Sequence, residues 1–282
     1  SNGTVNVNGF SPSIGGLSDG GGTAGTVVNN GGGAATITAG SSGATTTFSG
    51  SIADGSQALA LTKIGAGTLT LNGANTYSDT TTVNGGTLRI GNGATTGTLG
   101  SGPVVLTSGE LRFYRSDDVT ASTNLISGAG NLAKQGAGKA TLTGNNTYTG
   151  TTSVEGGTLE IGNGGSSGDI GSGAVTVNAG STLAFNRTGT LNYKATAKMR
   201  NVSGAGDIEL DGGVFFFNYT GAGGGFAEAG SWSGFSGDLR VLGGSEFQTI
   251  RNGATAMGTG TIELGDGSTS GYLSQIEGNW TW

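Results

Sequence analysis

One long segment of this chain occurs twice at a fixed spacing. Residues 61–91 have the sequence LTKIGAGTLTLNGANTYSDTTTVNGGTLRIG, and residues 132–162 have the sequence LAKQGAGKATLTGNNTYTGTTSVEGGTLEIG. The offset from Lys63 to Lys134 is 71 (134 − 63), and the same offset holds along the whole segment. Self-similarity at a fixed period is typical of proteins that stack repeats, in which neighbouring units bury a shared core. The repeat therefore constrains the architecture more strongly than any single residue does.

A third, weaker copy of the repeat begins at Phe235. Its sequence FSGDLRVLGG resembles YTGTTSVEGG at Tyr148, with the offset now 87 (235 − 148). Because a repeat array grows in one dimension, the length of the chain does not require separate domains. We predict one continuous solenoid over residues 1–282, made of lead-in turns at 12–60, units at 61–125 and 126–190, and a degenerate, aromatic-rich section at 191–282.

The glycines of this chain separate short runs of strand-forming residues. Of 282 residues, 62 are Gly, yet only 2 are Pro and 11% are charged, which is not the composition of a disordered chain. The runs include TLTL, TTTV, TLRI and AVTV, with β-branched or apolar residues in alternation. No amphipathic helical period is longer than about a turn. The sequence therefore predicts an all-β chain of short strands and tight turns.

A coil in which each strand pairs with the turns above and below it explains the spacing within the repeat. Inward side chains would then stack, and we expect the inward set to be Leu69, Leu71, Val83, Leu88 and Ile90. Corners need φ > 0, which favours glycine, and we place at corners Gly65, Gly67, Gly73, Gly85, Gly86, Gly91 and Gly93. Asn tolerates the same backbone region, so we assign Asn75 and Asn146 to turns or corner stacks.

Composition excludes several classes of function. The chain has no Cys and no His, which excludes disulfides, thiolate nucleophiles, imidazole bases and a Ser-His-Asp relay. A formal charge of −6 disfavours nucleic acid or an anionic membrane as a partner. No run is apolar enough for direct membrane insertion, and Ser1 opens no signal peptide, so an exported chain would be a mature or excised fragment. We expect no cofactor and no metal.

Acidic residues could support two kinds of chemistry. Asp117 and Asp118 form the one acidic doublet, but the matching region of the next copy, FNRTGTLNYK, contains no carboxylate, so we interpret the doublet as a solvated corner. A polysaccharide-processing enzyme would need several converging carboxylates, for which Asp207 and Asp211 are the other candidates. The segment around Asp207 also resembles calcium-binding nonapeptides, but the earlier copy has Asn131 in its place.

Aromatic residues concentrate in the last third of the chain. Because side chains alternate along a strand, consecutive Phe215, Phe216 and Phe217 cannot all face inward. One interpretation is a wide core filled by rings, and the other is a patch that binds sugar or protein, whose candidate residues are Phe215, Phe216, Phe217, Tyr219 and Trp232. Trp280 and Trp282 would share one side of a strand, where they would cap the open end or contact another copy of the chain.

The repeat resembles the autotransporter-associated β-strand repeat of bacterial passenger domains. The residues that carry this resemblance in the first copy are Lys63, Gly65, Gly67, Thr68, Leu69, Leu71, Gly73, Asn75, Tyr77, Thr80, Thr81, Val83, Gly86 and Leu88. Those in the second copy are Lys134, Gly136, Gly138, Leu142, Gly144, Asn146, Tyr148, Gly150, Val154, Gly157 and Leu159. The resemblance implies a right-handed parallel β-helix of about a dozen turns, exported and displayed at a bacterial surface, with no catalytic residue in the repeat.

Three hypotheses about function follow. The first is a non-enzymatic, extracellular stalk segment that holds the functional part of a surface adhesin or autotransporter away from the cell. The second is a filament subunit that stacks end to end on copies of itself, because head-to-tail contacts that do not close give open fibres. The third is a module that binds or processes glycans, or binds a host protein, through the carboxylates or the aromatic residues named above.

Overall fold

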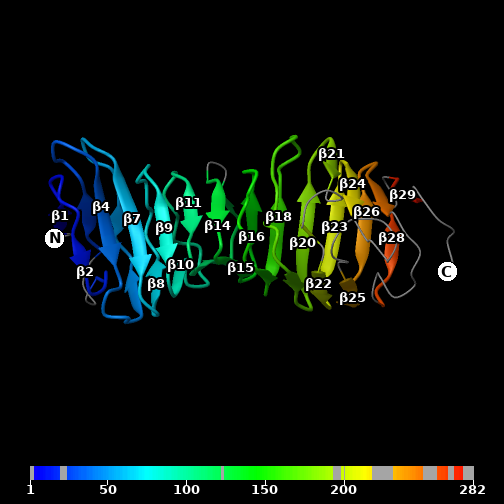
Figure 1. The fold of residues 1–282 in the computed structure, drawn as a ribbon, viewed down its shortest axis with the longest axis horizontal. Helices are drawn as coiled ribbons and strands as arrows, with labels where there is room; N and C mark the ends of the chain where they lie inside the picture. Colours follow the sequence, from blue (N-terminus) through cyan, green and yellow to red (C-terminus); the bar gives the residue numbers. More distant parts are fainter. Residues whose placement is uncertain are drawn as a thin grey trace, which may run out of the picture.

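The computed structural model describes residues 3–19, 24–121, 124–192, 198–199, 201–217, 231–249, 259–265 and 270–275. These ranges contain strands and turns but no helix, and every pairing between named strands is parallel. The strands stack along one long axis, with β1 (Thr4–Asn6) at one end and β28 (Ile262–Leu264) and β29 (Tyr272–Gln275) at the other (Figure 1). The chain is a β-solenoid of about ten turns, which confirms the all-β, parallel coil with slightly fewer turns than expected.

One side of the coil, which we call the third face, is a continuous sheet of nine strands. In order these are β5 (Thr46–Phe48), β8 (Thr68–Leu71), β10 (Thr87–Ile90), β12 (Glu110–Tyr114), β15 (Asn131–Gln135), β17 (Thr152–Val154), β19 (Val175–Val177), β22 (Asn201–Gly204) and β25 (Ser231–Phe235). Leu69 pairs with Leu88, an offset of 19 (88 − 69) for one coil. Val175 pairs with Val202, an offset of 27 (202 − 175) for a later coil. The length of a coil is therefore not constant.

The second face holds two sheets in succession. The first of them contains β2 (Ser13–Ile14), β4 (Ala35–Ala39), β7 (Leu59–Ile64), β9 (Thr81–Asn84), β11 (Val104–Leu106) and β14 (Ile126–Gly128). Nearer the C-terminus the second contains β21 (Thr190–Asn192), β24 (Val214–Phe217), β27 (Glu246–Thr249) and β29. Between them residues 145–149 continue the face without a strand, since the Thr147 amide donates to the Ile126 carbonyl (2.8 Å).

The first face is also divided into two sheets. One contains β1, β3 (Thr26–Val28) and β6 (Ser51–Ile52). The other contains β13 (Val119–Ala121), β16 (Lys139–Leu142), β18 (Gly157–Ile161), β20 (Ser181–Asn186), β23 (Asp207–Asp211), β26 (Leu239–Leu242) and β28. Residues 75–77 bridge the gap, because the Thr76 amide donates to the Ile52 carbonyl (2.9 Å). The chain thus visits the three faces in one order, as β6–β7–β8 and β13–β14–β15 show.

Successive copies of the repeat start on different faces of the coil. The strand of Lys63, β7, lies on the second face, whereas the strand of Lys134, β15, lies on the third. Val83 in β9, Val154 in β17 and Val241 in β26 follow the same progression from second to third to first face. From one copy to the next, the chain therefore makes three coils and advances one face further. The degenerate third copy continues this advance.

The predicted inward residues form the core. Leu69, Leu71, Val83, Leu88 and Ile90 are all at most 2% exposed. Glycines serve the corners in two ways. Gly65 has a positive φ of 70°, as predicted for a corner. Gly73 does not, and is instead required by close approach, because an added Cβ would lie 1.8 Å from the Gly50 carbonyl oxygen of the preceding coil.

Candidate functional site

Lys134 points into the core of the solenoid. In the strand register it stands between Phe113 and Val154, and its side chain is 1% exposed. The ammonium donates three hydrogen bonds to main-chain carbonyl oxygens, those of Gln135 (3.1 Å), Gly136 (2.8 Å) and Gly156 (3.0 Å). An ammonium has three donors and no acceptor, so this cage satisfies it completely. Because Gly156 belongs to the next coil, the lysine joins two coils from inside.

Lys63 makes the same cage in the first copy. It is also 1% exposed, and it donates to the carbonyl oxygens of Ile64 (2.7 Å), Gly65 (2.9 Å) and Gly85 (3.1 Å). Burial disfavours the charged form of an amine. It lowers the pKa of Lys63 below its ordinary value and lowers the pKa of Lys134 to about 8, although the charge of Asp118 acts in the opposite direction on Lys134.

A tyrosine and a threonine form the second polar pair inside each copy. The Tyr77 hydroxyl lies 2.7 Å from Thr81 Oγ1, and the Tyr148 hydroxyl lies 2.7 Å from Thr152 Oγ1. Both tyrosines are fully buried, and burial raises the pKa of each to about 12. A glycine of the following coil lies against each ring: an added Cβ at Gly171 would lie 2.3 Å from Tyr148. The ring therefore occupies the space that any other residue would need.

Asn75 and Asn146 bridge neighbouring coils where a strand is missing. They lie outside the strands, as the predicted turns or corner stacks require, but neither takes the positive φ on which that prediction was based. Asn75 Oδ1 accepts from the Ile52 amide (2.8 Å), and its Nδ2 donates to the Thr98 carbonyl (2.7 Å). The Asn146 side chain makes the same pair of contacts, with the preceding and the following coil. Each amide side chain thus replaces the main-chain ladder between neighbouring coils.

Two arginines close the glycine-rich loops at 91–97 and 162–168. Arg115 donates to the carbonyl oxygens of Thr95 (2.7 Å) and Gly97, and Arg187 donates to those of Ser166 (2.7 Å) and Gly168. Both residues are 8% exposed. The loops correspond at the repeat offset of 71 (162 − 91), whereas the arginines lie 72 residues apart (187 − 115). The two guanidinium groups nevertheless bond equivalent carbonyl oxygens.

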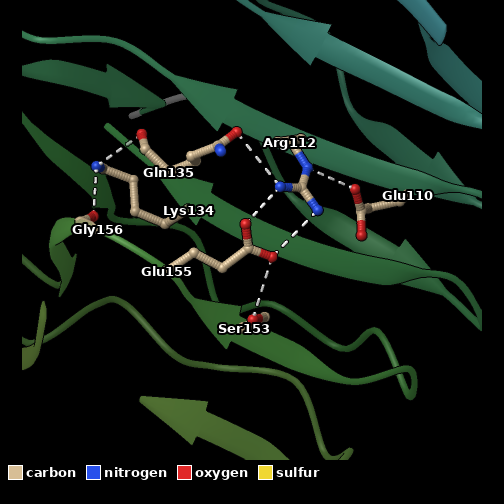
Figure 2. A network of polar contacts seen from close by, with 7 residues as sticks. All are labelled: Glu110, Arg112, Lys134, Gln135, Ser153, Glu155 and Gly156. Carbon is tan, nitrogen blue, oxygen red and sulfur yellow. Dashed lines mark hydrogen bonds and ion pairs between the residues drawn. The ribbon is translucent and has the colours of Figure 1, made fainter. Parts of the chain in front are cut away.

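A polar network joins the two copies on the outer side of the third face (Figure 2). Arg112 of β12 bonds both carboxylate oxygens of Glu155 (2.5 and 3.1 Å) and also Glu110 (2.8 Å). Ala133 of the intervening β15 pairs with Arg112 in the strand register and is 0% exposed. Arg112 and Glu155 therefore span a small residue, and they tie the last coil of the first copy to the second copy.

The aromatic candidates whose side chains the structure describes lie in the interior. Phe215 is 0% exposed and contacts Phe185 edge to face, with centroids 5.9 Å apart. Trp232 is 5% exposed, and its indole N–H donates to the Met199 carbonyl (2.8 Å). Neither side chain is available to an external ligand, so a surface patch containing these two residues is not supported.

The other aromatic candidates are described in part or not at all. Phe216 and Phe217 are placed by backbone pairing alone, opposite Gln248 and Thr249 of β27. Tyr219, Trp280 and Trp282 lie outside the described residues. The proposed roles of these five residues in binding, capping or self-association stay predictions.

The acidic candidates do not converge. Asp117 pairs with Arg115 (2.7 Å), and Asp118 Oδ1 accepts the Lys139 amide (2.9 Å), as expected of a solvated corner. Asp207 lies on β23, four strands from β13, and pairs with Arg240 (3.1 Å). Within the described ranges no three metal-ligating side chains are grouped, and no helix has the length and apolar character needed to cross a bilayer.

The buried lysines are the functional feature that sequence reasoning did not identify. A charged side chain is normally expected at the protein surface. Alternation in Leu61-Thr62-Lys63, however, places Lys63 on the inward side together with Leu61. The recurrence of an inward lysine in both copies was the available signal. Its carbonyl partners could not be named, because the fold alone brings the corner of the next coil to it.

Comparison with known proteins agrees with this picture of the repeat. Residues 61–90 and 132–161 each match the family model of the passenger-associated-transport-repeat. In an alignment 168 residues long that covers 52% of this chain, it is 32% identical to the Adhesin BmaC autotransporter of Brucella suis biovar 1 (strain 1330). It spans about 5% of the length of that relative. No solved structure matches the chain. The chain thus contains two copies of the passenger-associated-transport-repeat, at residues 61–90 and 132–161.

Proposed function

We propose that this chain is a non-enzymatic stalk segment of a bacterial surface adhesin of the autotransporter class. Its task would be mechanical: a stiff rod carries a binding region of the parent protein away from the cell. Parallel ladders on three faces and a continuous core supply stiffness without disulfides. At the strand spacing, ten coils correspond to a rod of about 48 Å.

The proposal rests on one observation: the polar residues that recur in both copies of the repeat are buried inside the coil. Lys63, Asn75 and Tyr77 are each at most 5% exposed, and their polar atoms bond to the chain itself. The advance of one face per copy also turns equivalent outer residues in different directions. A ligand surface repeated along one side of the rod would need equivalent residues on the same face. The repeat therefore serves the interior of a rod better than it serves a repeated binding surface.

Deleting one repeat tests the stalk in cells that display the parent protein. Removing residues 64–134 takes out one whole repeat and joins Lys63 to Gln135 in matching sequence register. We expect display and cell adhesion to continue, because the coil before the deletion then pairs with a coil of equivalent sequence after it. The control deletion removes residues 64–99, about half a unit, and should abolish display. Loss of adhesion with display intact, after the whole-repeat deletion, would show that the segment itself binds.

A head-to-tail filament is the second candidate, favoured by apolar exposure at both ends of the rod. Val5 (61%) and Phe10 (75%) are exposed near β1, and Leu264 (51%) and Tyr272 (58%) near β28 and β29. Stacking of one copy on the next would cover these side chains and pair the edge strands. Electron microscopy across a concentration series tests this. Fibres that shorten in Phe10→Ser would favour the filament, and single rods at every concentration would exclude it.

A further inference from the structure

One sheet of the second face carries no charge on its outer side. It contains β2, β4, β7, β9, β11 and β14, which lie side by side along the rod, and we call it the neutral sheet (Figure 1). The structure describes every residue of these strands, and their one charged residue, Lys63, points into the core. Asp54 and Asp79 precede β7 and β9, where their carboxylates accept the amides of Leu59 (2.8 Å) and Thr80 (2.6 Å). The outer surface of six successive strands is therefore uncharged.

A row of short side chains, nearly all with hydroxyl groups, runs along the middle of the neutral sheet. Each member pairs in register with the next along the rod, in the order Ser13, Thr38, Thr62, Thr82, Val105 and Ser127. Ser13 is exposed and the others are half-buried. A hydroxyl both donates and accepts hydrogen bonds, so a row of hydroxyl groups is able to bond to an identical row. Leu125, directly before β14, is 44% exposed and adds apolar surface beside the row.

The other two faces carry charges at the corresponding outward positions. On the third face Arg89 pairs in register with Arg112. On the first face Glu160 and Glu209 lie two strands apart, and Glu209 pairs in register with Arg240. The chain as a whole has a formal charge of −6, so two copies repel each other at long range. Contact through the neutral sheet brings no like charges together, whereas contact through either charged face does.

We propose that the neutral sheet docks laterally against the same sheet of a second copy of this chain. Two sheets pack face to face about 10 Å apart, with the side chains of the facing surfaces between them. A two-fold contact uses the same surface on both copies, which suits a row of groups that both donate and accept, and it closes after two copies. The proposal goes beyond the stalk function and does not depend on it.

The area of the neutral sheet predicts a weak pair. Six strands at a spacing of about 4.8 Å, each about five residues wide at about 3.3 Å per residue, present about 500 Å² per copy. The pair then buries about 1,000 Å² in total, which is at the low end of specific interfaces and typical of transient ones. We therefore expect a dissociation constant of about 10 μM to 1 mM. Copies held at high local concentration pair despite this weakness.

Sedimentation equilibrium of the full chain across a concentration series tests the pairing. We expect the mass to rise from that of one copy to that of two copies and to stop there. Salt at about 1 M should not weaken the pair, because no ion pair holds it. A chain that stays single up to about 1 mM overturns the proposal. So does pairing that is lost in salt, which assigns it to the charged faces, or a series of masses beyond two copies, which assigns it to the rod ends.

Lysine substitutions locate the interface. Thr62→Lys and Val105→Lys each place a cation in the row, so the pair holds like charges in an uncharged contact, and the dissociation constant should rise about tenfold or more. Thr182→Lys is the matched control, because it adds the same charge at a half-buried, outward threonine of the first face. It should leave the dissociation constant unchanged, as should Phe10→Ser at the rod end.

Circular dichroism checks that each variant is folded. The two substitutions in the row lie in different strands, β7 and β11, so either one alone tests the proposal if the other fails to fold. A folded Thr62→Lys or Val105→Lys chain that pairs as well as the unmodified chain overturns the proposal. Equal weakening by Thr182→Lys also overturns it, because the added charge would then act without regard to the face that carries it.

Discussion

The two copies of the repeat have the same interior and different exteriors. Each contains a lysine caged by three carbonyls, a tyrosine bonded to a threonine and an asparagine that bridges coils. Yet β7 lies on the second face and β15 on the third, so the same internal contacts are built in different surroundings. Each set of contacts therefore depends on its own coil and the next one. The same internal hydrogen bonds form whichever face of the rod the copy starts on.

Truncating the buried tyrosines is the strongest way to test this equivalence. We expect Tyr77→Ala and Tyr148→Ala each to lower the free energy of unfolding by about 3–5 kcal/mol, because a full ring leaves the core. Tyr→Phe at the same positions should cost about 1 kcal/mol, since the buried threonine hydroxyl loses its partner. Urea unfolding followed by circular dichroism measures all four variants. A large difference between Tyr77→Ala and Tyr148→Ala would contradict self-contained copies.

The pH dependence of stability should separate the two lysines. Burial lowers the pKa of Lys134 from 10.5 to about 8, so between these values the unfolded chain binds more protons than the folded chain. The free energy of unfolding must then rise with pH across this window. Above pH 10 the tyrosines act oppositely, because burial raises their pKa from 10.0 to about 12. Stability should therefore be greatest near pH 10.

Urea midpoints from pH 7 to 11 test this, with Lys134→Met and Lys63→Met as matched variants. The rise above pH 8 should become smaller in Lys134→Met, while Lys63, whose pKa burial also lowers, still contributes to it. It should persist in Lys63→Met, because Lys134 is still present. An unchanged rise in Lys134→Met would assign it to other groups and leave the buried ammonium without a role in the pH dependence.

The loop-closing arginines provide a smaller test on stability. Asp117→Asn should lower the free energy of unfolding by a small but measurable amount, because the buried Arg115 loses a charge-assisted, two-fold contact. The substitution leaves Arg115, like Arg187 of the second copy, with its two main-chain carbonyl partners. Asp118→Asn is the control and should cost less, since Asp118 accepts a main-chain amide hydrogen bond at the surface. Equal losses in the two variants would mean that the arginine pairing does not matter to the fold.

Alternation and glycine spacing were sufficient to predict the strands and the inward residues. Leu69 and Leu71 are buried as expected, because side-chain direction follows from period two alone. The orientation of the aromatic section was left open, and Phe215 proves to be internal. A run of three Phe residues is compatible with either side, and the choice depends on which neighbouring coil it pairs with.

The advance of one face per copy could not be predicted from the sequence. On the third face the offset between paired residues is 19 from Leu69 to Leu88 but 27 from Val175 to Val202, since corners accept additional residues without disturbing the ladders. Counting residues therefore does not tell how often the chain has gone round. The cage of Lys134 depends on the same information, because Gly156 meets the ammonium only once the coils are in place. Local patterns define strands, whereas pairing between coils defines sites.

The smallest expected effect concerns the contact that joins the copies. Arg112 and Glu155 side chains are 22% and 25% exposed, so water screens their attraction (Figure 2). A double-mutant cycle with Arg112→Ala and Glu155→Ala should give a coupling of about 0.2–1 kcal/mol that weakens at about 1 M salt. The control cycle pairs Arg112→Ala with Glu246→Ala, a distant carboxylate, and should show no coupling. Coupling well above this range would mean that the copies depend on an external tie, contrary to the self-contained interiors argued above.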